Sequence, residues 1–130
     1  KTDVTGDGVQ VTLTDNNEKA YEAKDLVNLI NELRAAGAEA ISINDERITN
    51  STSITCDGNV VLVNGNKISS PFVIKAIGSQ GLLYGSLTMI GGYLYILDEA
   101  GVIVETTQSD NLTVVKYTGV ISYKYMKNEK

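Results

Sequence analysis

The stretch Lys24–Asn44, KDLVNLINELRAAGAEAISIN, decides the fold of this chain. Within it, Leu26, Ile30 and Leu33 recur at the spacing that puts apolar side chains on one face of a helix. The polar residues between them would face water on the opposite side. The pattern therefore predicts an amphipathic helix over Lys24–Ala36, with its apolar face packed against the rest of the domain.

The ends of this helix are also marked in the sequence. Asp25 is a suitable N-cap, Arg34 complements the helix dipole in the last turn, and Gly37 stands where glycine commonly ends a helix. The apolar run Glu39–Asn44 follows directly and predicts a strand, and the alternating segment Gly8–Asp15 predicts a half-buried strand before the helix. Together they predict a β-α-β unit with a right-handed parallel crossover.

Short strands separated by tight turns are expected next. Apolar runs over 53–56, 59–63 and 67–68 are separated by Asp-Gly and Asn-Gly dipeptides, which are typical of hairpin turns. This spacing predicts a small antiparallel meander. Pro71 then precedes the apolar run Phe72–Ile77, which is expected to be a strand because proline is tolerated at the start of a strand.

The region after Gly78 predicts a second helical segment, which Gly91-Gly92 interrupts. Its second part, Tyr93–Ala100, fits a helix that Gly101 ends, but the letters YLYIL are also compatible with a strand. Both interpretations remain open at this point.

The complete pattern predicts one α+β domain over residues 1–130, with a core over about 6–119 and a tail over 120–130. Two further strands, 102–107 and 112–115, are expected to be joined by a turn. We expect a mixed sheet with the helices on one face.

Composition excludes several function classes. The chain has 130 residues, no histidine, one cysteine and a formal net charge of −5. It therefore cannot form a Ser-His-Asp triad, a Cys-His pair, an internal disulfide or a thiolate zinc site. An acidic chain with two arginines is a poor binder of polyanions, so no nucleic-acid partner is expected. We also expect no cofactor and no metal.

Three residues, Asn44, Arg47 and Lys75, are candidates for a binding site. The first two belong to a loop after a predicted strand, where ligands often bind, and an arginine there can hold a carboxylate or phosphate through two hydrogen bonds. Lys75 interrupts the apolar run Phe72–Ile77. The structural alternatives are a turn with a surface arginine, and an outward lysine that blocks pairing at a sheet edge. Cys56 is expected to be half-buried and structural.

Several segments of the chain resemble, in the same order, one bacterial family. They are Asp25–Asn44, Arg47-Ile48, Ser53–Gly58, Val63–Gly65, Pro71–Gly78 and Tyr117–Gly119. This is the YlxW/YlxX-type family of bacterial envelope proteins, a domain of unknown function sometimes labelled "division initiation protein". The three candidate residues match positions typical of its motifs. At Tyr84 and Gly85 the chain departs from the charged, helix-forming segment usual in the family, so the resemblance does not itself predict a helix over 82–89.

The resemblance implies a cellular context rather than a reaction. Members are similar to single-pass membrane proteins of Gram-positive bacteria, in which a membrane helix and a coiled coil precede a domain outside the membrane. Their genes often lie near cell-division genes, and no catalytic residue is established. We therefore expect a non-enzymatic extracytoplasmic domain of a membrane-anchored protein whose anchor is absent here. It would act through contacts with an envelope or division protein, or with itself.

Two alternatives belong to other functional classes. In the first, the chain binds a small ligand or a cell-wall fragment, and Asn44, Arg47 and Lys75 converge on one pocket. In the second, it is an enzyme that works without histidine, which would require two carboxylates about 5–10 Å apart in a cleft.

Overall fold

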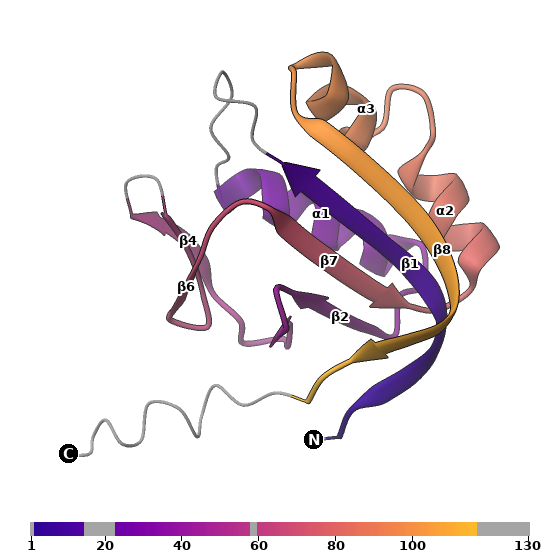
Figure 1. Cartoon of the computed structure of the whole chain (residues 1–130), viewed down its shortest axis with the longest axis horizontal. Coiled ribbons are helices and arrows are strands. Elements are labelled where there is room, and N and C mark those ends of the chain that lie inside the picture. The colour runs from indigo at the N-terminus through magenta and orange to yellow at the C-terminus, as the bar shows by residue number, and fades with distance from the viewer. Residues whose placement is uncertain (1, 15–22, 58–59, 117–130) are drawn as a thin grey trace.

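The computed structural model describes residues 2–14, 23–57 and 60–116 (Figure 1). The elements, in chain order, are β1 (Val4–Thr14), α1 (Ala23–Ala35), β2 (Ala40–Ile43), β3 (Glu46–Arg47), β4 (Ile54–Asp57), β5 (Val60–Val63), β6 (Asn66–Ile68), β7 (Phe72–Ile77), α2 (Gln80–Leu87), α3 (Tyr93–Glu99) and β8 (Ile103–Val114). The predicted tail over 120–130 lies outside the described residues.

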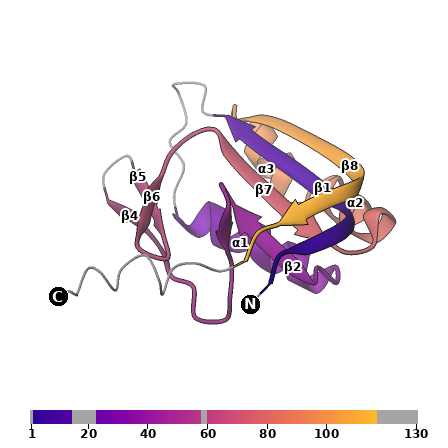
Figure 2. The ribbon, with the colours of Figure 1, turned by 60° about the horizontal axis from the view of Figure 1, so that its bottom comes forward.

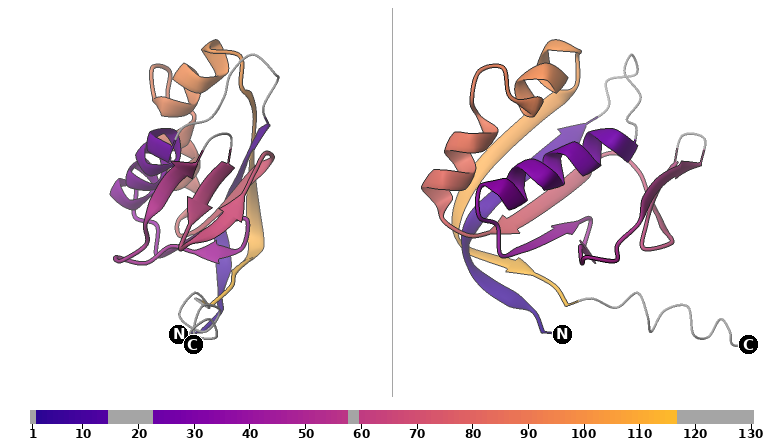
Figure 3. Two further views of the ribbon diagram at one scale, coloured as in Figure 1. Left: turned by 90° about the vertical axis from the view of Figure 1, so that its left-hand side faces the viewer. Right: turned by 180° about the vertical axis from the view of Figure 1, so that it is seen from behind.

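The described strands form two sheets, which confirms the predicted α+β class. The larger sheet has the order β3-β2-β7-β1-β8, and the smaller sheet, β4-β5-β6, is the predicted meander. Figure 3 shows all three helices on the same face of the larger sheet, as expected.

The prediction of a mixed sheet is wrong, because every described strand pairing is antiparallel. Helix α1 does connect two strands that run in the same direction, β1 and β2. However, β7 lies between them and pairs antiparallel with both. The apolar run Phe72–Ile77 after Pro71 predicted the strand β7, but it carried no information about which strands would become its neighbours.

The core lies between the larger sheet and the helices. The predicted helical face is confirmed, since Leu26, Ile30 and Leu33 are all buried. The expected N-cap is wrong: α1 begins at Ala23, and Asp25 lies buried inside its first turn. There its carboxylate accepts a hydrogen bond from the Tyr93 hydroxyl. Asp25 therefore ties α1 to α3.

The second helical region consists of two short helices, and Tyr93–Glu99 is helical rather than extended. The Ser79 hydroxyl caps α2 by accepting a hydrogen bond from the Leu82 N–H at 3.3 Å. Gly101 follows α3 with φ +102°, a left-handed conformation that favours glycine. Glu32 of α1 accepts a hydrogen bond from the first N–H of α3 at 3.0 Å. Contacts from α1 therefore select the helix for a segment whose sequence was ambiguous.

β8 is one long strand, where two strands and a turn were predicted. It pairs with β1 along most of its length, and the register shifts at a bulge between Gly6 and Gly8. A Cβ on Gly8 would lie 2.0 Å from the backbone oxygen of Ala76, so only glycine allows the two backbones to approach this closely. The bulge lets both strands bend together: Ser109 pairs with Gly8 and Leu112 with Gly6, and Asp110 and Asn111 between them lie in the bulge instead of forming a turn that ends the strand.

Beyond the bulge, residues 2–6 and 112–116 curl over the sheet face that the helices leave open (Figures 1 and 2). We call residues 2–6 and 112–116 the terminal arm. The apolar side chains of the terminal arm are Val4, Leu112 and Val114. They form a second small core with Ala40 of β2 and Ile77 of β7. The arm therefore covers one end of the open face.

Candidate functional site

Asn44, the first candidate, has a structural role in the turn after β2. Its φ is +48°, and asparagine is among the few residues that tolerate this left-handed conformation. Its Nδ2 donates to the carbonyls of Ser69 and Pro71 at 3.4 and 3.3 Å. Its Oδ1 accepts from the Val73 N–H at 2.7 Å. These bonds fasten the start of β7 to the turn and occupy both ends of the amide.

Lys75, the second candidate, lies on the central strand of the larger sheet, so the interpretation as an edge lysine is wrong. Its Nζ lies 3.8 Å from Oδ1 of Asp45, and both side chains are partly exposed. Lys75 and Asn44 line one hollow of about 380 Å³ with Asp45, Pro71 and Val73. An exposed ion pair of this length contributes little to stability.

Arg47, the third candidate, holds the terminal arm in place. Its Nη1 donates to the backbone oxygens of Thr2 and Val115, at 3.0 and 3.1 Å. Ser42 is the cross-strand partner of both Arg47 and Lys75, so these two cations lie on the same sheet face with Ser42 between them. They nevertheless line separate hollows. The predicted convergence of all three candidates on one pocket is therefore not found.

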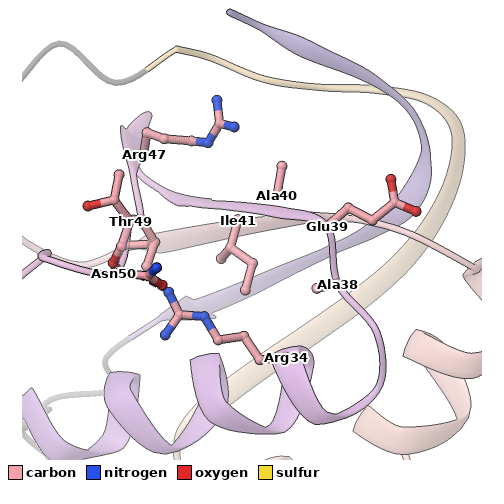
Figure 4. Close-up of a pocket in the computed structure, with 9 residues that line it drawn as sticks. Arg34, Ala38, Glu39, Ala40, Ile41, Arg47, Thr49 and Asn50 are labelled. Carbon is pink, nitrogen blue, oxygen red and sulfur yellow. Dashed lines mark hydrogen bonds between the residues drawn. The ribbon is translucent and has the colours of Figure 1, made fainter. Parts of the chain in front are cut away.

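The hollow at Arg47 contains a residue that the sequence reasoning assigned only to the helix dipole, Arg34. Figure 4 shows Arg34 reaching from α1 towards Thr49 and Asn50, with Arg47 on the other side of the β2 backbone. The hollow measures about 310 Å³. It is lined by Arg34, Ala38, Glu39, Ala40, Ile41, Arg47, Ile48, Thr49 and Asn50. One feature of the sequence pointed to this site, namely that Arg34 and Arg47 are its only two arginines.

Both guanidinium groups lack a counter-charge in the part of the chain that the structure describes. The Nη2 of Arg34 donates to the Thr49 carbonyl at 3.4 Å, and Arg47 is bound to two carbonyls. Within residues 2–14, 23–57 and 60–116, neither arginine has a carboxylate oxygen within 4.0 Å, although Glu39 lines the same hollow. Neutral carbonyls thus position two full positive charges beside an open cavity.

Other chemistry-bearing groups serve the fold or lie on the surface. Asp25 and Glu32 both bind Tyr93, through its hydroxyl and its N–H. Cys56 is exposed, so the expectation that it is half-buried is wrong: it lies on an outer strand of the smaller sheet. The described residues contain no group of three or more His, Cys, Asp or Glu side chains placed to hold a metal ion. None of the described helices combines the length and apolar character that a membrane crossing requires.

Sequence comparison places this fold among known relatives. A family described as bacterial proteins of unknown function, DUF881, matches residues 1–127. The chain belongs to the DUF881 family. Among DUF881 relatives, the UPF0749 protein YlxW of Bacillus subtilis is 33% identical over 118 residues, which are 84% of this chain and 51% of that protein. The UPF0749 protein Rv1825 of Mycobacterium tuberculosis is 32% identical over 132 residues, covering 97% of this chain and 44% of its own length.

A solved structure shares this fold. The crystal structure of an uncharacterized conserved protein from Mycobacterium tuberculosis superposes with a TM-score of 0.81 at 31% sequence identity. The match covers 89% of this chain and 83% of that one. Together with the relatives named YlxW and YlxX, these matches confirm the YlxW/YlxX-type family. The chain spans about half the length of the first two proteins compared above.

Proposed function

We propose that this chain is a non-enzymatic association domain of a membrane-anchored bacterial envelope protein, on the outer side of the membrane and near the division or wall-synthesis machinery. The observation that supports association is a set of exposed apolar side chains on α2, on α3 and in the segment between them. The membrane anchor, the location and the link to division rest on the resemblance of the sequence motifs. The proposal that the domain acts without catalysis rests on the residue composition, which has no histidine and one cysteine, and on the resemblance.

The apolar surface is unusual for an acidic chain. No residue from Ala76 to Leu97 is charged. Five large apolar side chains of this stretch are exposed, and we call them the helical patch: Leu82 (66%), Met89 (62%), Ile90 (83%), Tyr95 (43%) and Ile96 (52%). Single exposed apolar residues are ordinary, but five of them within one uncharged stretch of sequence are typical of a surface that a protein covers.

The same surface contains a groove that suits a second copy of the domain. Small residues of α1 and α2 line it, namely Ala35, Ala36, Gly81 and Gly85, together with Leu82 and Met89. Its volume is about 430 Å³. The exposed side chains of Leu82 and Met89 therefore border the groove, and projecting side chains beside a receiving groove are the arrangement that a two-fold symmetric contact requires. We propose self-association through this face as the specific form of the association.

Sedimentation of the domain over a concentration series tests this association. We expect the wild-type mass to rise towards that of a dimer, and the double variant Leu82→Glu/Met89→Glu to remain monomeric. Both side chains are exposed, so the substitutions should leave folding intact. Ile103→Glu is the matched control, because Ile103 is 51% exposed but lies on β8. A monomeric wild type at all concentrations, or equal loss of dimer in the control, would refute self-association.

The proposed location is tested through the exposed Cys56. In a full-length protein whose other cysteines are replaced, a membrane-impermeant maleimide should label Cys56 in intact cells as completely as after lysis. Cys56→Ser provides the background. Labelling that occurs only after lysis would place the domain inside the cell and contradict the proposal.

A further inference from the structure

We propose that the hollow between Arg34 and Arg47 binds a carboxylate that lies next to an aliphatic group, the chemistry shared by a peptide C terminus and a free N-acylated amino acid. This site is distinct from the helical patch and involves none of its residues. It does not depend on self-association of the domain.

The charge distribution is the first argument for an anionic ligand. Both arginines of a chain with net charge −5 line this one hollow. A guanidinium offers five N–H donors in a planar fork that matches a carboxylate. The bonds described for Arg47 use only Nη1, and Arg34 makes one bond, from Nη2. Both groups therefore retain donors for a ligand.

Pre-organisation is the second argument. Arg47 is only partly exposed and is held by the backbone carbonyls of Thr2 and Val115 in the terminal arm. Thr49 and Asn50 form the wall beside Arg34, and Thr49 is itself fixed, since its N–H donates to Oγ1 of Thr52 at 2.7 Å. A wall and a cation that are already ordered lose little conformational entropy when a ligand binds.

The neighbouring surface explains why the ligand should also carry an aliphatic group. A smaller hollow of about 100 Å³ adjoins the first and shares Arg34, Thr49 and Asn50 with it. Apolar side chains of α1 and β4 contribute to its lining, namely Val27, Ile30 and Ile54. A ligand whose carboxylate binds Arg34 can therefore place a short aliphatic group against this wall, with Arg47 on the other side of β2 adding positive charge to the same hollow.

The proposal is tested by adding N-acetyl-leucine to the ¹⁵N-labelled domain and following its amide signals. N-acetyl-leucinamide, which has the same aliphatic group but no charge, is the matched control ligand. We expect N-acetyl-leucine to shift the signals of Ile41, Thr49 and Asn50 at millimolar concentration, and the amide to have little effect. A leucine-terminated peptide distinguishes the two sources, because it binds more tightly only if the site recognises a peptide C terminus.

Variants assign the binding to the two arginines. Arg34→Gln should weaken binding about tenfold, the loss expected for a charge-assisted hydrogen bond. Arg34 is exposed, so this variant should fold normally. Arg47→Lys keeps the charge but loses the planar fork, and should also weaken binding. Lys75→Gln, which removes the cation of the other hollow, and Leu82→Glu in the helical patch should leave binding unchanged.

Four results would overturn the proposal. They are no binding of N-acetyl-leucine, equal binding of the neutral amide, unchanged binding by Arg34→Gln, or an equal loss in Lys75→Gln. Inorganic phosphate is a further probe: shifts at the same residues with phosphate, but not with N-acetyl-leucine, would show a general anion site and refute the carboxylate-and-aliphatic ligand.

Discussion

Asn44 shows how a residue that looks like a binding candidate can be required by the backbone instead. Its amide makes three hydrogen bonds to the segment leading into β7, and its φ is positive. Asn44→Ala should therefore lower the free energy of unfolding by about 2–3 kcal/mol, from lost hydrogen bonds and left-handed strain. Urea denaturation measures this loss.

Asn44→Asp is the matched variant for this prediction. It keeps the acceptor for the Val73 N–H and tolerates the positive φ, but it loses the two long donor contacts. We expect a smaller loss than in the alanine variant. Equal losses in both variants would show that the bond to Val73 contributes little.

At the scale of elements, α2 is a helix formed against its own propensity. Gly85 lies inside it, and a Cβ there would meet no atom within 4 Å. Gly85→Ala should raise the free energy of unfolding by about 0.5–1 kcal/mol, because alanine restricts the unfolded chain and favours the helix. Thermal unfolding of dilute protein provides the measurement.

Gly91 supplies the control for this effect. It also has open space around it, but its φ is +87°. Gly91→Ala should therefore destabilise the domain by about 1–2 kcal/mol, with the opposite sign to Gly85→Ala. A gain in stability from both substitutions would mean that the backbone conformation at Gly91 has no influence.

At the scale of the whole molecule, Arg47 joins the two ends of the domain to the edge of the larger sheet. Its bonds reach Thr2 and Val115, 45 and 68 residues away in sequence. Arg47→Gln should loosen the terminal arm while leaving the main core intact. Hydrogen exchange should become about tenfold faster at Val4 and Val114 and remain unchanged at Val11, since local opening does not require global unfolding. Uniformly faster exchange across the domain would contradict a local role of Arg47. Lys67→Gln, which removes an exposed cation of β6, is the control variant.

The sequence determined the elements whose pattern is local. The period of Leu26, Ile30 and Leu33 predicted α1, and the Asn-Gly and Asp-Gly dipeptides predicted the meander. The apolar run Phe72–Ile77 after Pro71 predicted β7. The sequence also identified Arg47 as a binding candidate, but it assigned Arg34 only to the helix dipole. It did not relate the two arginines, because α1 and β3 come close to each other only in the folded chain.

Only the tertiary structure decided the order of the strands and the surroundings of each candidate residue. β7 separates β1 from β2, and α1 makes Tyr93–Glu99 a helix by contacting Tyr93. The same distant contacts bind Asn44 and Arg47 to backbone carbonyls and leave two arginines beside one cavity. The physical reason is that side-chain periodicity depends on neighbours in sequence, whereas strand order, hydrogen-bond partners and uncompensated charge depend on residues brought together by folding.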